Sequence, residues 1–415
     1  MRAFYTLVIT QMLSMIGSRM SSTAIGLRVF AETGSAAPLL LVAFFNELPA
    51  MLGSSFAGVL IDRWDRRRVL IVADSGQAAG TLLLLFSFTS GSFQLWHLYA
   101  VALLNGVFAM FQGPAKDAAI TQLVPDAHRD RANALQAMSF PLAGVAAPAL
   151  TGLFYAVIGL AGIVLIDLLT FLAAVLAVVA IHIPAPTRTA EGQRSSGGLR
   201  REWLGGLRYL RLHPALLGLV LYFTVMNFLL NGPLELSIPY LMTITTSETT
   251  TGLVLAMNSL GGVVGAGLLA VWGGTRPRIH TIMPAMLLVG AMFLLYGTTR
   301  APLLLAVSIF VLIAALQVWA LYTSILQAKT PPDMQGRVFA LVAQLGYLGA
   351  TTSFLLTGPL VDRVLEPAAA RPGDGIGALL VGTGVVILLL TALVYALPAV
   401  RHLERDLPGY EEAVT

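Results

Sequence analysis

Long apolar runs, separated by short loops that carry arginine, constrain this chain more than any other feature. Several runs approach 20 residues, for example around 82–85 and 385–390. A helix of about 20 residues is long enough to cross a hydrocarbon core of about 30 Å. Only 11% of the 415 residues are charged, whereas a soluble domain usually has about 25%. The sequence therefore predicts an all-α membrane protein.

The apolar runs number twelve and fall into two groups of six. They cover residues 5–29, 38–61, 69–90, 96–122, 131–158 and 161–183, then 214–241, 249–273, 279–298, 302–328, 336–361 and 376–399. We expect an N-terminal six-helix bundle at 1–183 and a C-terminal six-helix bundle at 214–415. The linker at 184–213 begins rich in Pro, Gly and Ser. Its second part, 199–212, alternates arginine with apolar residues, which is typical of a helix lying on a membrane surface.

Lysine and arginine positions predict the orientation of the chain. If the N-terminus is inside, twenty of the 25 basic residues lie in inside segments and three lie outside, with Arg19 and Arg28 within a span. Inside loops of membrane proteins are enriched in these residues. The distribution therefore places both termini and the linker in the cytoplasm, and we expect a multi-pass protein of the bacterial inner membrane.

A faint internal repeat relates the two halves. When the sequence is shifted by 206 residues, Pro125 and Arg131 align with Pro331 and Arg337. Two parallel repeats predict a pseudo-symmetric pair of bundles, with a substrate site between them near the membrane midplane.

The loop between the second and third spans contains the most specific motif. It reads Gly58-Val-Leu-Ile-Asp62-Arg63-Trp64-Asp65-Arg66-Arg67-Arg68. This motif resembles the loop signature of the major facilitator superfamily, although Asp65 stands where the general pattern has glycine. The Asp-Arg-Trp-Asp-Arg-Arg segment is similar to the branch that contains macrolide-efflux and enterobactin-export proteins. The resemblance implies the major facilitator fold and a drug:proton antiport activity.

In that family the acidic loop gates movement between the halves, and here the resemblance assigns it the same role. Physically, an aspartate there can accept hydrogen bonds from a helix N-terminus, and the arginines can hold it and the anionic lipid surface. The alternative is a plain positive-inside loop. The candidate gating residues are Gly58, Asp62, Arg63, Arg66, Arg67 and Asp74. The second half matches the branch more loosely, because its loop at 272–278 lacks an aspartate, and Asn105 and Gly106 stand where the superfamily has a basic residue in span four.

Ionisable residues within spans are candidates for proton coupling. A charge there costs at least a few kcal/mol, so it usually faces a cavity or a partner. Arg19 lies about 21 Å along span one, taking ~1.5 Å per residue, and Glu47 lies at a similar depth in span two. We therefore expect an Arg19–Glu47 ion pair, serving either coupling or structure. Asp167 and Glu235 are the next candidates, and Pro233 and Pro239 predict a broken helix around Glu235.

Four side chains in the second half are candidates for a substrate cavity. Aromatic rings can stack on a hydrophobic drug, although packing or lipid-facing roles explain them equally well. The aromatic residues that could do so are Tyr222, Phe223, Phe228, Trp319 and Tyr322, and the four cavity candidates are Tyr222, Asn227, Phe228 and Trp319.

Several functions are excluded by what the sequence lacks. There is no cysteine, and the six histidines show no metal-ligand spacing, so we expect no metal and no cofactor. No Walker loop or nucleophile–base arrangement is present, which predicts a protein that is not an enzyme. The net charge of +4 comes from short loops, so nucleic acid is not an expected partner.

The sequence as a whole predicts a secondary-active transporter, expected to act as a monomer. Its expected partners are a small-molecule substrate, protons and membrane lipids. We predict proton-coupled efflux of amphipathic small molecules such as drugs, macrolides or siderophores. One alternative is transport of a specific polar metabolite, and another is a membrane scaffold that does not transport.

The predicted topology is open to a direct labelling test. Because the chain has no cysteine of its own, a single cysteine introduced by Ser196→Cys can be labelled cleanly in the linker. A membrane-impermeant thiol reagent should leave it unmodified in intact cells and modify it in inverted vesicles. Labelling from outside intact cells would refute the cytoplasmic linker.

Overall fold

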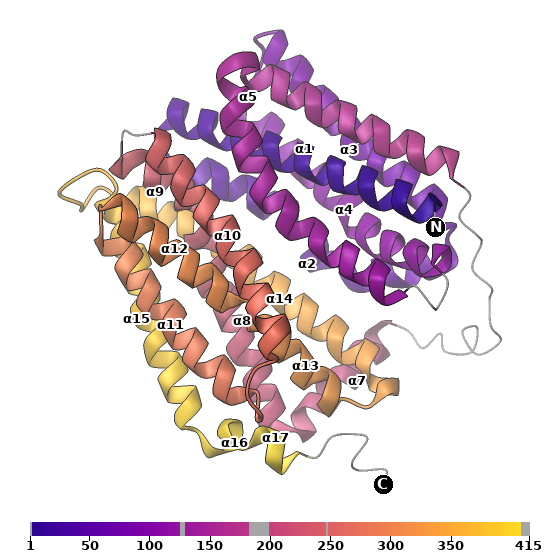
Figure 1. Cartoon of the computed structure of the whole chain (residues 1–415), viewed down its shortest axis with the longest axis vertical. Coiled ribbons are helices and arrows are strands. Elements are labelled where there is room, and N and C mark those ends of the chain that lie inside the picture. The colour runs from indigo at the N-terminus through magenta and orange to yellow at the C-terminus, as the bar shows by residue number, and fades with distance from the viewer. Residues whose placement is uncertain (1, 125–128, 182–198, 246–247, 408–415) are drawn as a thin grey trace. The chain divides into compact units, whose positions relative to one another are not determined.

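The structure is a computed structural model of the whole chain and describes residues 2–124, 129–181, 199–245 and 248–407. Every regular element in these residues is a helix (Figure 1). The chain divides into two compact units, Met1–Gly197 and Gly198–Thr415. The predicted linker at 184–213 falls partly outside the described residues, and its helical second part belongs to the second unit.

The described residues of the first unit form five helices, the last of which is bent. They are α1 (Arg2–Thr33), α2 (Ala37–Arg63), α3 (Arg66–Thr89), α4 (Leu95–Leu123) and α5 (Arg129–Ala180). Within α5, Gly159 adopts φ 64° and ψ −173°. This left-handed φ is accessible to glycine at no steric cost. The two predicted spans 131–158 and 161–183 are therefore two arms of α5 that meet at one residue.

The second unit contains more elements, because two of its spans are broken and because it also has a helix before its first span, a π-helical turn and two short helices near its end. They are α7 (Leu199–Leu212), α8 (Pro214–Glu235), α9 (Ser237–Ile244), α10 (Glu248–Trp272), α11 (Ile279–Thr298), α12 (Pro302–Leu316), α13 (Trp319–Lys329), α14 (Pro332–Leu360), a π-helical turn η2 (Val361–Leu365), α15 (Asp374–Ala396), α16 (Pro398–Arg401) and α17 (Leu403–Asp406). The helix break expected around Glu235 is confirmed, because α8 ends there and α9 begins at Ser237. A second break separates α12 from α13 at residues 317–318.

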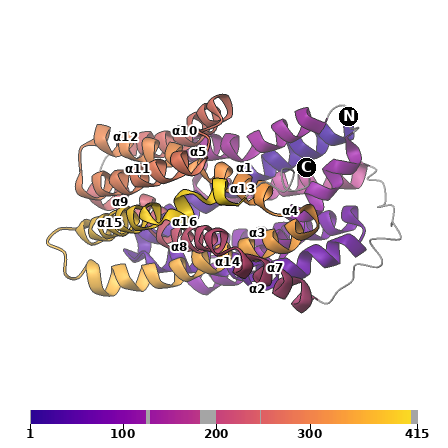
Figure 2. The same ribbon diagram turned by 90° about the horizontal axis from the view of Figure 1, so that it is seen from below.

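The two units use the same pairing of helices, each considered by itself (Figures 1 and 2). In the first unit α2 packs on α4, α3 packs on α4 and α5, and α1 packs on α5. In the second unit α10 packs on α12, α11 packs on α12 and α15, and α8 packs on α14. This correspondence matches the faint sequence repeat and makes the two bundles pseudo-symmetric.

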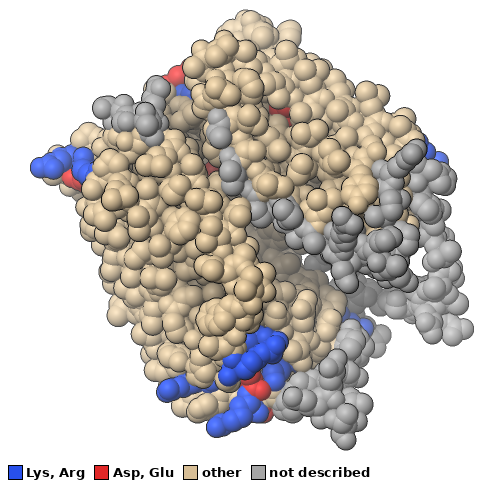
Figure 3. All heavy atoms as spheres, in the orientation of Figure 1, with Lys and Arg blue, Asp and Glu red and all other residues tan. Residues whose placement is uncertain are grey.

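Ten stretches of helix in the described residues are long and apolar enough to cross a membrane. The ten do not include α1, although it is 32 residues long, so the count of twelve crossings stays a prediction. On the visible face of the second unit, charged side chains gather at the two ends and leave the surface between them nearly uncharged (Figure 3). One end carries the Arg300–Asp374 ion pair (2.5 Å) and the other the Arg278–Glu404 pair (3.5 Å). This is the distribution expected of a bundle that crosses a membrane.

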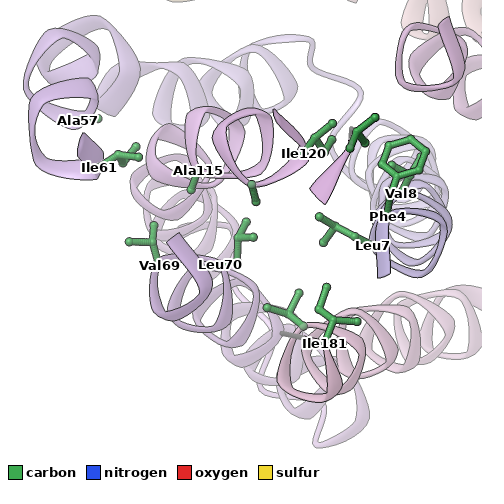
Figure 4. Packing of buried hydrophobic residues seen from close by; sticks show 13 residues of the cluster. Phe4, Leu7, Val8, Ala57, Ile61, Val69, Leu70, Ala115, Ile120 and Ile181 are labelled. Atoms are coloured by element: carbon green, nitrogen blue, oxygen red, sulfur yellow. The ribbon is translucent and has the colours of Figure 1, made fainter. Parts of the chain in front are cut away.

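A hydrophobic cluster holds the five helices of the first unit together near the N-terminus (Figure 4). Its buried members are Phe4, Leu7, Val8, Ala57, Ile61, Val69, Leu70, Ala115, Ala119, Ile120, Val124, Val178 and Ile181. Because every helix contributes, the cluster fixes the positions of the ends of α1, α3 and α4. It thereby also positions the polar side chains that lie one to two turns further along these helices.

The second unit has a hydrogen-bond network around Lys329, which is only 8% exposed. Its ammonium donates hydrogen bonds to the carbonyl oxygens of Glu404 (2.8 Å) and Leu407. The carbonyl of Lys329 accepts from the Tyr209 hydroxyl (2.5 Å), and Glu404 Oε2 accepts from the backbone N–H of Ile279 (3.1 Å). One lysine therefore ties α7, α13 and the segment around α17 together, and Glu404 adds α11.

The closest approach of α2 and α4 requires a glycine at position 106. A Cβ atom added there would lie 2.1 Å from the backbone oxygen of Asn46 and 2.9 Å from its carbonyl carbon. Backbone atoms cannot move aside as a side chain can, so α4 would have to shift away from α2.

We therefore expect Gly106→Ala to destabilise the protein by about 1–3 kcal/mol, the usual cost of overpacking. Gly113→Ala is the matched control in the same helix, because a Cβ there meets nothing within 4 Å and alanine favours helix. Thermal unfolding in detergent compares the two variants. Equal melting temperatures would show that the α2–α4 contact is not tight.

Candidate functional site

One face of α3 carries three polar residues at helical spacing. Asp74, Gln77 and Thr81 are separated by three and four positions, so they lie on the same side of the helix. All three are buried, with 0%, 9% and 4% of their surface exposed. Polar groups buried within a membrane span need partners, and these three point into the bundle rather than toward lipid.

Asp74 is held by two glutamines from other helices. Gln11 Nε2 on α1 donates to Asp74 Oδ2 at 2.8 Å, and Gln112 Nε2 on α4 donates to Asp74 Oδ1. Gln112 Nε2 also lies 3.3 Å from Gln11 Oε1. The positive charge of Lys116, one turn beyond Gln112, also acts on this carboxylate. Hydrogen bonds to a charged group are each worth about 1.5–3 kcal/mol, so this cluster locks α1, α3 and α4 in register.

Asp167, on the second arm of α5, is held by hydroxyl groups instead. Ser18 Oγ donates to Asp167 Oδ1 at 2.9 Å, and Thr81 Oγ1 donates to Oδ2 at 3.3 Å. The aspartate is 4% exposed. A Cβ on Gly17 would lie 2.5 Å from Thr170 Oγ1 and 3.1 Å from Asp167 Cα. Glycine at that position therefore lets α1 approach α5 closely enough for Ser18 to reach the carboxylate.

Two cavities lie along this polar face and share Ser18, Gln77 and Phe171 in their walls. The first has a volume of about 180 Å³ and the second about 160 Å³. The first extends to Gln112 and Lys116, and the second is bounded by Asp167. Together they carry polar side chains through the inside of the first unit, with Asp167 in the wall of the second cavity and the two glutamine partners of Asp74 in the wall of the first.

The two residues expected to form an ion pair in spans one and two are not joined in this structure. Arg19 and Glu47 are both half-buried. Among the described residues, no ion pair links them and no hydrogen bond reaches the Glu47 carboxylate. Equal depth along two helices does not fix the direction in which each side chain points. Proton coupling by Glu47 stays a prediction.

The predicted gating residues are only partly described. The side chains of Gly58, Asp62 and Arg63 lie outside the described residues, so the gating latch stays a prediction. Of the others, Arg67 donates through Nε to the carbonyl of Val178 (3.1 Å) and through Nη2 to that of Val179.

Asp65 caps the start of α3. Its Oδ1 accepts from the backbone N–H of Arg67 at 2.9 Å, and its other carboxylate oxygen lies 3.8 Å from Arg68 Nε. An aspartate at this position therefore stabilises the helix N-terminus. Arg66, another gating candidate, begins the same helix and is half-buried. The carboxylate of Asp74, the last of these candidates, is held by the glutamines on α1 and α4.

In the second unit, the cavity candidates lie along α8 and α13. Phe223 is stacked on Tyr322 with ring centroids 3.9 Å apart, and it meets Trp319 edge-on at 4.7 Å. Tyr222 is buried, and its hydroxyl is 2.8 Å from Thr391 Oγ1 on α15. In this structure Tyr222 therefore packs α8 against α15.

The remaining candidates of the second unit differ in exposure. Asn227 and Phe228 are half-buried, and Asn227 Nδ2 donates to the carbonyl of Phe223 at 3.0 Å. Glu235 is exposed at the end of α8. Phe223 and Tyr322, two of the aromatic residues noted in the sequence, form the centre of the aromatic cluster.

The hydrogen bonds to Asp74 can be tested by a double-mutant cycle. Gln11→Leu should destabilise the protein by about 1–3 kcal/mol, since it leaves a buried carboxylate with one donor fewer. The cost should shrink when Asp74→Asn is combined with it, because the charge is then gone. Gln77→Leu is the control, since within the described part of the chain Gln77 Nε2 donates to the carbonyl of Ala73 in its own helix, at 3.4 Å, and not to Asp74. Additive losses in the cycle would contradict the contact.

Comparisons with known proteins agree with this architecture. A family model described as Major Facilitator Superfamily matches residues 7–354. The chain is 26% identical over 376 residues to macrolide efflux protein A of Streptococcus pyogenes, covering 87% of this chain and 90% of that protein. It is also 26% identical over 390 residues to the multidrug efflux pump Tap of Mycolicibacterium fortuitum, covering 91% of each.

Solved structures share the fold at low sequence identity. A crystallised variant of the nucleoside transporter NupG is similar with a TM-score of 0.77 and 14% identity, covering 95% of this chain and all of that one. A bacterial homologue of the human lysosomal transporter Spinster gives a TM-score of 0.74 and 16% identity, covering 98% of each chain. The family match spans most of the sequence, and the helical pairing agrees with it. The chain therefore belongs to the Major Facilitator Superfamily, and it is a multi-pass membrane transporter rather than an enzyme.

Proposed function

We propose that this transporter exports amphipathic small molecules, such as macrolides and other lipophilic drugs, in exchange for protons. It does so across a bacterial inner membrane with both termini in the cytoplasm. The support for the direction and the substrate class is the similarity to two efflux proteins over almost their whole length. The likeness to a nucleoside transporter supports the fold alone.

The environment of Glu47 is the observation that supports proton coupling. It lies inside α2, in a stretch long and apolar enough to cross the membrane, and it is half-buried. Within the described residues its carboxylate has no hydrogen bond or ion pair. A carboxylate that no cation holds in its charged form can gain and lose a proton without breaking a structural contact. Obligatory exchange follows when substrate and proton are bound in turn.

The alternative of a specific polar metabolite predicts a different substrate profile. Such a carrier needs several polar groups that match one ligand, whereas a drug exporter tolerates many lipophilic shapes. Competition by macrolides, lipophilic cations and nucleosides against one labelled macrolide separates the two possibilities.

The coupling is tested with purified protein in liposomes under an imposed pH gradient. The wild type should concentrate a macrolide against its gradient, and a protonophore should abolish this. Glu47→Gln should lower the concentrative rate by about tenfold or more, equivalent to ~1.4 kcal/mol. Substrate binding itself should persist, because the variant keeps the shape of the side chain.

Glu32→Gln is the matched control, since Glu32 forms an exposed pair with Arg28 on α1 at 2.8 Å. It should transport at the wild-type rate. A Glu47→Gln protein that still concentrates substrate would show that another carboxylate, Asp167 or Glu235, couples transport. Transport that ignores the pH gradient would contradict proton coupling altogether.

A further inference from the structure

Asp167 is a buried carboxylate without a basic partner in its cavity. It is 4% exposed and bounds the 160 Å³ cavity of the first unit. Among the described residues that line this cavity there is no Lys, Arg, His or Glu and no second Asp. Asp74 hydrogen-bonds to Gln11 and Gln112 beside the neighbouring cavity, and Arg19 is not part of this lining. A lone negative charge in a low-dielectric interior requires a proton or a cation.

Oxygen-bearing side chains from three other helices line the cavity beside this carboxylate. Ser18 on α1 and Thr81 on α3 are within 2.9 and 3.3 Å of it. Ser21, one turn beyond Ser18, lines the same cavity. Asn105 on α4 lines the same cavity. Its Oδ1 lies close to Gly80, the residue before Thr81, because a Cβ atom added to Gly80 would be 3.0 Å from that oxygen. Hard cations prefer carboxylate, hydroxyl and amide oxygens of this kind.

Two of these oxygens lack the hydrogen bonds that buried polar atoms normally make. Ser21 is 5% exposed, and its Oγ has no hydrogen bond of good geometry with the described residues. Asn105 Oδ1 is buried and has no hydrogen-bond donor within the described part of the chain. Because an amide oxygen can only accept, it is satisfied by a donor or by a cation. Both atoms belong to residues in the wall of one polar cavity, so their missing hydrogen bonds indicate a ligand there.

We propose that this cavity binds one Na⁺ ion. The ion is held by the Asp167 carboxylate together with neutral oxygens of Ser18, Ser21, Thr81 and Asn105. One carboxylate balances one positive charge, and no group of three or more His, Cys, Asp or Glu side chains comes together in the described residues, which disfavours a divalent ion. A cavity of about 160 Å³ also has room for a water ligand, which occupies about 30 Å³.

The site lies beyond the proposed export activity, because ion binding here needs no substrate and does not involve Glu47. A proton and Na⁺ compete for Asp167, since protonation removes the charge that attracts the ion. Na⁺ affinity therefore falls as the pH is lowered, with one proton displacing one ion.

The test is equilibrium binding of radioactive ²²Na⁺ to the purified full chain without substrate, at alkaline pH, with choline holding the ionic strength constant. The expected result is saturable binding of one ion per chain that weakens on acidification. Asp167→Asn should weaken it by about tenfold or more, equivalent to ~1.4 kcal/mol. Asp117→Asn is the control for the loss of a carboxylate, because Asp117 is exposed on α4 and pairs with Gln136.

Two neutral variants keep the proposal falsifiable if Asp167→Asn fails to fold. Ser21→Ala and Asn105→Ala should each weaken Na⁺ binding while the charge remains. Ser87→Ala is their control, because Ser87 is equally buried at 5%, donates to the carbonyl of Leu84 in its own helix, and is not among the residues that line the cavity. Absence of saturable ²²Na⁺ binding, or binding that Asp167→Asn leaves unchanged, overturns the proposal. Either result leaves the export activity intact, since that activity is measured with macrolide and a pH gradient.

Discussion

The cost of burying a charge in a membrane-spanning bundle governs the arrangement of this protein. A carboxylate or ammonium group inside the bundle is tolerated only where polar groups from other helices reach it. Asp74 has Gln11 and Gln112, and Lys329 has two backbone carbonyls. Each of these contacts joins segments far apart in the sequence. The positions of the helices within each unit are therefore set by polar contacts as well as by apolar packing.

The same constraint separates structural charges from functional ones. Asp74 accepts hydrogen bonds from two amide groups on other helices, so it has a clear structural role within the bundle. Glu47 and Asp167 have no basic group in the described contacts. A carboxylate that the protein does not neutralise by itself is the group whose occupancy by a proton or ion can change during transport.

The helices could be predicted from the sequence because their signal is local. Run length and apolarity set each span, and the prolines at 233 and 239 marked the break after Glu235. The identity of the buried carboxylates was also predictable, since an aspartate in an apolar run is expensive. The spacing of Asp74, Gln77 and Thr81 carried further information, and reading it as one helix face would have indicated the polar lining of the first unit.

The partners of those carboxylates could not be predicted in the same way. Gln11, Gln112 and Ser18 come from other helices, and their contacts depend on the rotation of each helix about its axis. The Arg19–Glu47 pair illustrates this limit, because matched depth was known and rotation was not. Close approaches such as Gly17 against Asp167 decide the rotation, and no pattern within a single helix reveals them.

The hydrogen-bond network around Lys329 has a consequence for how the protein is made. Lys329 leaves the ribosome before its two carbonyl partners, which follow 75 and 78 residues later. Translation proceeds at about 5–20 residues per second, so the newly inserted lysine waits several seconds without them. The cation enters its final environment only after α15 has crossed the bilayer and the chain has folded back. The buried ammonium group of Lys329 therefore gains these two hydrogen bonds only when the second unit is complete. A chain that ends before residue 404 lacks both carbonyl partners.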